Sequence, residues 1–328
     1  MRPILVTGGT GFLGRHLVEY LMGQGRKVRV IGRRSVVRWR RNPGVEHIRV
    51  DIAEPGVVEE VLAGVDRVYH LAAATRGDWA TYRAVTVDAS AQLLESFAAQ
   101  GGGRIVFVSS LGNYDGGAIR DGDIVDEAFG LEQNPQGRGY YARAKVEAER
   151  IAQSYLTHPS VKLTIVRPGV IYGPGMKNPL TGVALPIMGK MWVVPGKGEK
   201  PVPLIYIDDV IRALVHIMER EQTVGRIYNL VHPQMHSQNQ YLALYRKLTG
   251  DRRLLVRIPS HVLVTFSGFV DHITRLLTGQ DRQLGYKSSR FLKRIYYSCD
   301  RLKQDTGFQA QVSLEEGMRR MFDGTKDG

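Results

Sequence analysis

A tyrosine and a lysine at a spacing of four stand in the segment YYARAK, residues 140–145. The segment lies in a run that reads as helical from about residue 138 to residue 154, and residues four apart on a helix share one face. This spacing selects Tyr141 as the partner of Lys145. A phenol titrates at about 10, and one pKa unit corresponds to about 1.4 kcal/mol, so a nearby cation can prepare it for acid–base chemistry. We expect Tyr140, on a different face, to serve in packing.

A glycine-rich turn gives a second chemical signal. The sequence ILVTGGTGFLG at residues 4–14 places Gly8, Gly11 and Gly14 directly after an apolar run and at the start of a helical pattern. A tight turn needs residues without a Cβ, the backbone must approach a pyrophosphate closely, and a helix N-terminus supplies partial positive charge. At the first strand–helix junction of the chain, this triplet predicts dinucleotide binding.

The residues after the second expected strand bear on the choice of cofactor. An acidic residue there binds the ribose 2′-hydroxyl of NAD, whereas an arginine accommodates the 2′-phosphate of NADP. The strand at 28–31 is followed by GRR at 32–34, and the fork of Arg33 suits a phosphate. We therefore predict NADP, with NAD as second choice, and expect Asp51 and Ile52 near the adenine. The alternative is that both arginines belong to a solvated basic surface.

The first half of the chain alternates strand-like and helix-like segments. Strands are expected at 4–6, 28–31, 47–50, 67–71, 104–108 and 163–166. Helices are expected at 12–22, 57–62, 87–99 and 138–154. Strands separated by helices pair in parallel, with helices on both faces of the sheet. The predicted fold class is α/β: a Rossmann-type doubly wound parallel sheet with a smaller C-terminal substrate-binding region.

The turn-rich stretch 168–203 interrupts this alternation, and the strand–helix pair at 204–218 is expected to rejoin the sheet. We predict that residues 1–168 form an NAD(P)-binding domain to which 204–232 return. Residues 169–203 and 233–328 would then form the substrate-binding region.

Composition narrows the functional classes. The 328 residues are 43% apolar and 23% charged, as in ordinary globular proteins. A single cysteine, Cys299, excludes an internal disulfide and a cysteine-based zinc cage and favours a reducing compartment. The N-terminal apolar run is too short for a signal peptide, and the longest apolar stretch, 261–270, is too short to span a bilayer. We expect a cytoplasmic protein without a metal site, because the nine histidines show no ligand-type spacing.

The net charge of +13 is concentrated in residues 26–41 and 282–303. No nucleic-acid fold signature accompanies it, so we expect a solvated basic surface and no nucleic-acid partner. The segment 258–277 is expected to close the substrate region as a helix. A weak contact with a membrane surface is the second interpretation.

Taken in order, these and further segments resemble the extended short-chain dehydrogenase/reductase family, also called the NAD-dependent epimerase/dehydratase family. The matching pieces are TGGTGFLG (7–14), DI (51–52), HLAA (70–73), VSS (108–110), Tyr141-x-x-x-Lys145, RPGVIYGPG (167–175), YIDDV (206–210), DTGF (305–308) and VSLEEG (312–317). The resemblance covers nearly the whole chain.

The resemblance implies a role for each matching residue. Tyr141 would exchange a proton with the substrate oxygen, Lys145 would hydrogen-bond the nicotinamide ribose and lower the pKa of the tyrosine, and Ser110 would orient the carbonyl or hydroxyl. The implied cofactor-binding residues are Gly8, Thr10, Gly11, Phe12, Leu13, Gly14, Arg33, Asp51, Ile52, Leu71, Ala72, Ala73, Tyr141, Lys145, Pro168 and Val170. Members of the family often form homodimers through two helices, which match 88–99 and 140–154 here.

Two positions depart from the family pattern. Thr86 stands where an asparagine is usual, which leaves the local hydrogen bonds open. Val202 stands where nucleotide-sugar members often carry an arginine for the diphosphate, although Lys197 or Lys200 could compensate. A buried diphosphate without that arginine loses hydrogen bonds worth roughly 1.5–3 kcal/mol each.

We therefore expect an NADP-dependent oxidoreductase that interconverts a ketone and a secondary alcohol on an apolar or amphipathic small molecule. The alternative is a nucleotide-sugar epimerase or dehydratase with retained NAD. A nucleotide-sensing or RNA-associated protein without turnover is a third class, and the intact Ser110, Tyr141 and Lys145 argue against it. Expected pocket residues are Trp79, Tyr114, Tyr172, Met188, Trp192 and Tyr206.

Overall fold

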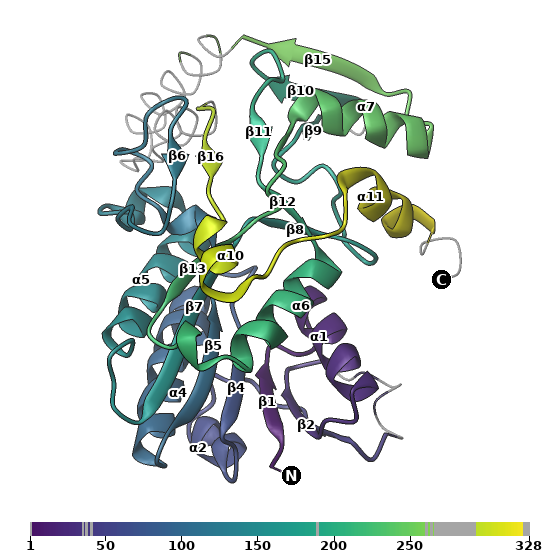
Figure 1. Cartoon of the computed structure of the whole chain (residues 1–328). Coiled ribbons are helices and arrows are strands. Elements are labelled where there is room, and N and C mark those ends of the chain that lie inside the picture. The colour runs from purple at the N-terminus through teal and green to yellow at the C-terminus, as the bar shows by residue number, and fades with distance from the viewer. Residues whose placement is uncertain are drawn as a thin grey trace.

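A seven-stranded parallel sheet forms the centre of the molecule (Figure 1). Its strands are β1 (Ile4–Thr7), β2 (Val28–Ile31), β3 (Val45–Ile48), β4 (Arg67–His70), β5 (Gly103–Val108), β7 (Val161–Pro168) and β13 (Ile227–Leu230). They stand in the order β13-β7-β5-β4-β1-β2-β3, and every neighbouring pair is parallel. The order reverses at β1, which lies between β2 and β4, and ligands of such sheets bind at the carboxyl ends of the strands at this switch point. The computed structural model describes residues 2–34, 36, 39, 42–187, 190–259, 262, 265 and 293–323.

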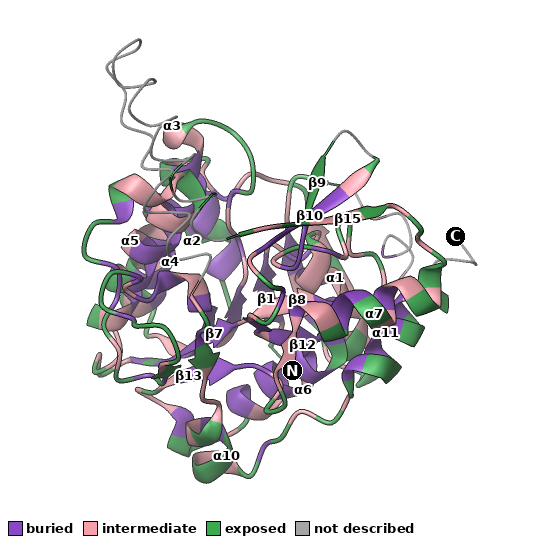
Figure 2. Ribbon diagram, turned by 90° about the horizontal axis from the view of Figure 1, so that it is seen from above, coloured by how far each residue is buried: buried purple, intermediate pink, exposed green. Residues whose placement is uncertain are grey.

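Helices cover both faces of this sheet. On one face lie α1 (Phe12–Gly23) and α6 (Ile207–Met218); on the other lie α2 (Val57–Leu62), α4 (Ala89–Ala99) and α5 (Tyr140–Ser154). Successive side chains of a strand point to opposite faces, so Val6 joins the core under α1 and α6 while Leu5 joins the core under the other helices. Figure 2 shows the buried residues along the strands and the inward sides of the helices. The predicted doubly wound α/β fold is confirmed.

Most of the smaller elements lie beyond the carboxyl ends of the sheet strands, where α7, β10, β15 and α11 gather at one end of the molecule (Figure 1). The strands are β6 (Ile124–Val125), β8 (Val170–Tyr172), β9 (Leu185–Ile187), β10 (Met191–Pro195), β11 (Pro201–Val202), β12 (Leu204–Tyr206), β14 (His236–Ser237), β15 (Leu254–Ile258) and β16 (Tyr296–Tyr297). The helices are α7 (Gln238–Thr249), α10 (Asp300–Thr306) and α11 (Leu314–Asp323), with short 3-10 turns at Leu111–Asn113, Pro135–Arg138 and Glu221–Thr223. In the described part of the chain, no helix is long and apolar enough to cross a membrane.

The strand expected to rejoin the sheet after residue 203 does not do so. β12 pairs in parallel with β8, and the place beside β7 is taken by β13. The chain passes very close to itself here, because a Cβ on Gly169 would lie 2.1 Å from the carbonyl oxygen of Pro203. The helix of the pair, α6, does pack against the sheet.

Three expected boundaries also move. β3 begins at Val45 rather than at residue 47, because its register places Val45 beside Val28 of β2. The helix expected from 138 begins at Tyr140, since Gly139 has a φ of +85° that ends the preceding turn. The helix expected at 87–99 begins earlier, with α3 (Trp79–Tyr82) and a π-helical segment, Arg83–Asp88, running into α4.

Candidate active site

The glycine loop between β1 and α1 is shaped for close approach of a ligand. Gly8 has a φ of +66°, and the N–H of Gly11 donates to its carbonyl at 2.9 Å, which closes the turn. A Cβ on Gly8 would lie 2.9 Å from the backbone of Ala72, and one on Gly14 would lie 2.3 Å from the carbonyl oxygen of Gly8. The N-cap residue of α1 is Gly11, which has no side chain to cap the helix. These features fit a dinucleotide pyrophosphate, which needs bare backbone and free N–H groups.

A buried polar chain holds this loop against β4. The Thr7 hydroxyl accepts from the N–H groups of Leu71 and Ala72 at 3.1 and 3.2 Å, so its own proton is donated to Nδ1 of His70 at 2.8 Å. Nε2 of His70 then donates to the Ser90 hydroxyl at 2.8 Å, and that hydroxyl donates to the Thr86 carbonyl. Burial, with a smaller effect of Lys145, lowers the pKa of His70 to about 3, so the ring is neutral. The ends of β1 and β4 are thus fixed relative to each other.

Thr86 takes part in the same region. Its hydroxyl accepts from the N–H of Ala74 at 2.9 Å, just beyond the predicted cofactor residues Leu71, Ala72 and Ala73. The threonine at this position, within the π-helical segment, therefore holds the backbone of Ala74 through its hydroxyl and the side chain of Ser90 through its carbonyl.

The expected adenine end lies at the carboxyl ends of β2 and β3. Thr10 packs against the chain just before Arg33, because a Cβ on Gly32 would lie 2.5 Å from its hydroxyl. Arg33 is 65% exposed, and its guanidinium stands 3.5 Å from the carboxylate of Asp51, an interaction that contributes little at such exposure. Ile52 is buried in the core beneath, while Phe12 and Leu13 pack partly against the other core.

The three predicted catalytic residues belong to the end of β5 and the first turns of α5. Lys145 is 5% exposed, and its ammonium donates to the carbonyl of Val108, the last residue of β5, at 2.6 Å. Ser110 follows two residues later, and its hydroxyl accepts from the N–H of Gly112 at 3.0 Å. Tyr141 lies one helical turn before Lys145 and is 45% exposed. Pro168 and Val170 follow at the end of neighbouring β7, where the N–H of Val170 donates to the Pro203 carbonyl at 2.7 Å.

The electrostatics of this pair differ from the expectation. Burial lowers the pKa of Lys145 to about 8, partly opposed by the carboxylate of Glu149. The pKa of Tyr141 is raised rather than lowered, first by desolvation and then by the phenol of Tyr82. The Tyr141 residue is 45% exposed, and the ammonium of Lys145 is turned to the carbonyl of Val108. The expected lowering of the tyrosine pKa by Lys145 was therefore wrong.

Sequence reasoning missed a buried network behind the site. Glu149 is fully buried and accepts from Arg167 at 2.7 Å and from the amide of Asn113 at 2.8 Å, and it also pairs with the Ser109 hydroxyl. The same amide donates to the Lys145 carbonyl at 3.0 Å. The available signal was a glutamate four residues after the lysine, on the same helix face.

Aromatic side chains flank the start of α5. The guanidinium of Arg143 stacks 3.6 Å from the ring centre of Trp79, and Tyr140 lies 6.2 Å from Trp79 and 6.1 Å from Tyr82. Tyr140 therefore packs against two rings, as expected, although its side chain is half exposed. Among the expected pocket aromatics, Trp79 thus contacts the first turn of the helix that carries Tyr141.

Four other expected pocket residues belong to the core. Tyr114 is fully buried and donates to Asn229 at 2.6 Å, and Trp192 is buried with its indole N–H bonded to Asp251 at 3.0 Å. Tyr172 and Tyr206 pack edge to face at 5.4 Å. Their burial against residues distant in sequence excludes them from an open pocket. The remaining candidate, Met188, and most of the segment 258–277 lie outside the described residues.

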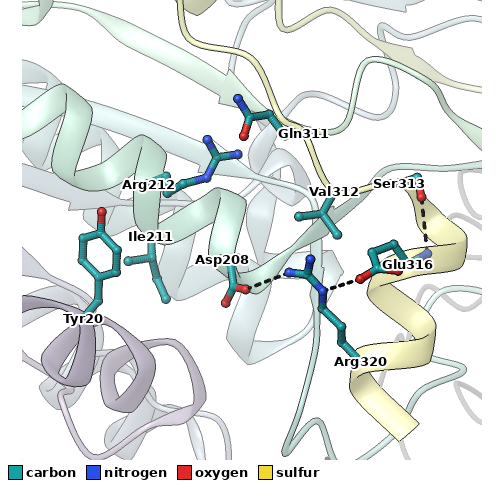
Figure 3. Close-up of a pocket in the computed structure, with 9 residues that line it drawn as sticks. All are labelled: Tyr20, Asp208, Ile211, Arg212, Gln311, Val312, Ser313, Glu316 and Arg320. Carbon is teal, nitrogen blue, oxygen red and sulfur yellow. Dashed lines mark hydrogen bonds and ion pairs between the residues drawn. The ribbon is translucent and has the colours of Figure 1, made fainter. Parts of the chain in front are cut away.

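A cavity of about 670 Å³ lies elsewhere, between α1, α6 and α11 (Figure 3). Its arginines are already neutralised: Arg320 pairs with Asp208 at 3.6 Å and Glu316 at 2.7 Å, and Arg212 pairs with Asp209. None of its lining residues is in the predicted catalytic or cofactor set. Among the residues that the structure describes, no group of three or more His, Cys, Asp and Glu side chains is placed to hold a metal.

Known proteins provide an independent comparison. Residues 4–230 match the model of the NAD dependent epimerase/dehydratase family. A 2-alkyl-3-oxoalkanoate reductase of Stenotrophomonas maltophilia is 28% identical over 97% of this chain and 98% of its own length. A UDP-glucuronic acid decarboxylase of Arabidopsis thaliana is 32% identical over 70% of this chain and 54% of its own.

Solved structures show the same fold. The UDP-glucuronic acid 4-epimerase of Bacillus cereus, in complex with NAD, has a TM-score of 0.75 at 20% identity and covers 99% of both chains. These comparisons support an NAD-dependent type of enzyme and give no support for NADP over NAD. The chain belongs to the NAD-dependent epimerase/dehydratase family, the extended short-chain dehydrogenases/reductases.

Proposed function

We propose that this chain is an NADP-dependent oxidoreductase that interconverts a ketone and a secondary alcohol on an apolar or amphipathic small molecule. The observation that carries the proposal is the set of Ser110, Tyr141 and Lys145 at the same sheet edge as the glycine loop. The charge of the Lys145 ammonium also acts on the neighbouring strand β4, where it adds to the effect of burial in lowering the pKa of His70.

The chemistry follows from the residue types. A bound nicotinamide supplies or removes the hydride in such a reaction. In the reducing direction, Tyr141 gives its phenolic proton to the carbonyl oxygen, so that hydride and proton together convert the ketone to the alcohol. The Ser110 hydroxyl donates a hydrogen bond to the same oxygen, and the Lys145 ammonium stabilises the tyrosinate that remains.

Two observations support a substrate without a diphosphate. Val202, at the position where nucleotide-sugar members often carry an arginine, is 2% exposed and pairs with His236 in a short antiparallel contact. The two 2-alkyl-3-oxoalkanoate reductases match 97% and 96% of this chain. A ketone flanked by alkyl chains and a carboxylate has the amphipathic character that we propose. We place the substrate among residues 169–203 and 233–328.

The choice of NADP is supported by Arg33. Residues 32–36, directly after β2, include no carboxylate to hold a ribose 2′-hydroxyl, and the contact of the exposed Arg33 guanidinium with Asp51 is long, at 3.5 Å. A 2′-phosphate would offer it a charge-assisted hydrogen bond.

The second candidate is a nucleotide-sugar epimerase or dehydratase that retains NAD. It is favoured by the UDP-glucuronic acid decarboxylases among the relatives and by the fold shared with NAD complexes of sugar-nucleotide enzymes. In that case Lys197, which is exposed, or Lys200 would have to serve the diphosphate.

We further propose a homodimer formed by α4 and α5 of each subunit. Both helices bury one side in the domain core and leave exposed residues such as Glu95 and Arg150 on the other. Sedimentation of the purified protein tests this: a dimer mass supports it, and a monomer at all concentrations contradicts it.

The function is tested by supplying each substrate class with each cofactor. Purified protein is mixed with NADPH or NADH and either a 2-alkyl-3-oxoalkanoate or a UDP-hexuronic acid, and products are identified by mass spectrometry. Consumption of NADPH with formation of a 3-hydroxy acid supports the proposal. Conversion of the nucleotide sugar without net use of added cofactor would establish the second candidate instead.

A further inference from the structure

The carboxylate of Glu149 is buried with a complete set of donors. Its side chain is 0% exposed, and Arg167 approaches one oxygen through two nitrogens at 2.7 and 2.5 Å. The other oxygen accepts from the amide of Asn113 at 2.8 Å and from the hydroxyl of Ser109. Charge-assisted bonds of this kind are the strong ones in proteins.

Glu149 and two of its donors, Ser109 and Arg167, belong to the three segments that carry the proposed site. Ser109 precedes Ser110 at the end of β5, Arg167 precedes Pro168 in β7, and Glu149 itself lies one turn after Lys145 on α5. Asn113 closes the connection, because its amide donates to both Glu149 and the Lys145 carbonyl, the latter at 3.0 Å.

We propose that Glu149 is a positioning residue of this site: its carboxylate locks α5 to the ends of β5 and β7 and presents its negative charge to Lys145. The roles of Ser110, Tyr141 and Lys145 in this inference rest on the proposed function. A different role would be purely structural, with Glu149 serving only to neutralise Arg167, since a buried pair of this kind can often be replaced by apolar residues.

The surroundings of Lys145 separate these two roles. The groups that interact with it are Glu149 from α5, His70 from β4, and the Phe107 ring and Val108 carbonyl from β5, with Arg167 of β7 behind Glu149. Tyr141 lies one turn before it on α5. His70 is neutral, and the raised pKa of Tyr141 keeps its phenol neutral. Within the described residues, Glu149 is thus the anion that opposes the effect of burial on Lys145, whose pKa is about 8.

The test is a titration of Lys145 in the full-length protein without substrate. An amine-specific reagent is applied across a pH series, and the extent of labelling at Lys145 is measured by peptide mass spectrometry. The Glu149→Gln variant should move the midpoint to lower pH by at least about half a unit, because the negative charge next to the ammonium is lost. Glu147→Gln is the matched control: it removes the same charge from the same helix, where Glu147 pairs with Arg143 at 2.8 Å, and it should leave the midpoint in place.

A double variant keeps the inference testable if Glu149→Gln alone does not fold. Glu149→Gln leaves Arg167 buried without its partner, so Glu149→Gln with Arg167→Met removes both charges and should still show the lowered midpoint. An unchanged midpoint in either folded variant, or an equal shift in Glu147→Gln, would overturn the inference. Because no turnover is measured, an absence of ketone reduction in the wild-type protein would reject the proposed function and leave this result standing.

Discussion

The Lys145 ammonium on helix α5 donates a 2.6 Å hydrogen bond to the carbonyl of Val108 at the end of strand β5. The bond links the helix layer to the sheet. It fixes the rotamer of a long side chain, so the entropy cost of ordering that side chain is met within the fold itself. It uses one of the three N–H donors of the ammonium. The protein's own backbone therefore holds the lysine at the carboxyl edge of the sheet.

Burial of Lys145 predicts opposite pH trends for stability and for cofactor binding. Its pKa falls from 10.5 to about 8 on folding. Between these values the unfolded chain binds more protons, so the contribution of this group to the free energy of unfolding rises as pH increases from about 8 to about 10.5. Cofactor binding that needs the ammonium should weaken over the same range. Urea unfolding and NADPH titration across this range check both trends, and Lys145→Met should remove them. Persistence of the trends in that variant would contradict the assignment.

The glycine loop predicts a sharp contrast between two glycines of α1. A Cβ on Gly14 would lie 2.3 Å from the Gly8 carbonyl oxygen and 2.6 Å from the Cα of Gly9, so Gly14→Ala should deform the loop. We expect at least a tenfold loss in cofactor affinity, about 1.4 kcal/mol. Gly23 has nothing within 4 Å of its Cβ position, so Gly23→Ala should keep the affinity and stabilise the helix by about 0.5–1 kcal/mol. Calorimetric titration of both variants with the cofactor measures this contrast. Equal affinities in the two variants would argue against a cofactor at this loop.

Arg33 should discriminate between the two cofactors. If its guanidinium meets a 2′-phosphate, Arg33→Ala weakens NADPH binding by at least about tenfold, about 1.4 kcal/mol, and leaves NADH binding nearly unchanged. Arg34→Ala, which removes an exposed charge from the next position, should affect both cofactors alike. Fluorescence titrations at two salt concentrations measure this. Tight NADH binding in the wild-type protein, insensitive to Arg33→Ala, would favour NAD.

Asp209 should anchor the C-terminal segment. Its buried carboxylate accepts from the N–H groups of Gln311 and Val312 at 3.1 and 2.9 Å, so Asp209→Ala leaves both without a partner and should cost about 2–4 kcal/mol. Its neighbour Asp208 is half exposed and stands 3.6 Å from Arg320, so Asp208→Ala should cost less than about 1 kcal/mol. Denaturant unfolding gives the free energy of unfolding of both variants. Equal losses would contradict the proposed anchoring of the C-terminal segment by Asp209.

Much of the fold follows from local sequence pattern. The apolar runs of β1, β2 and β5 and the glycine turn before α1 are local features, and their alternation with helices implies parallel pairing. Local sequence does not determine which strand joins the sheet. Leu204–Tyr206 has the composition of an inner strand, yet β13 holds the place beside β7, because pairing is decided by contacts between distant segments.

In the candidate site, too, the features that lie on one element can be predicted from sequence, and those that depend on distant segments cannot. The Tyr141–Lys145 spacing and the glycine loop are visible in sequence because each lies on one element. The burial of Tyr114 depends on Asn229 and Arg167, more than 50 residues away, and an aromatic residue type serves a pocket and a core equally well. The raised pKa of Tyr141 likewise depends on its surroundings in the fold, first through desolvation and then through Tyr82 from another helix.

The most direct test of the account follows the transferred hydrogen. Wild-type and Tyr141→Phe proteins are given a 2-alkyl-3-oxoalkanoate and NADPH that carries deuterium at the transferable position of the nicotinamide, with Tyr140→Phe as control. The account predicts deuterium on the carbinol carbon of the product with wild type and Tyr140→Phe, and a loss of at least about a hundredfold in rate with Tyr141→Phe. Transfer at an unchanged rate in Tyr141→Phe, or no transfer to any ketone by the wild-type protein, would contradict it.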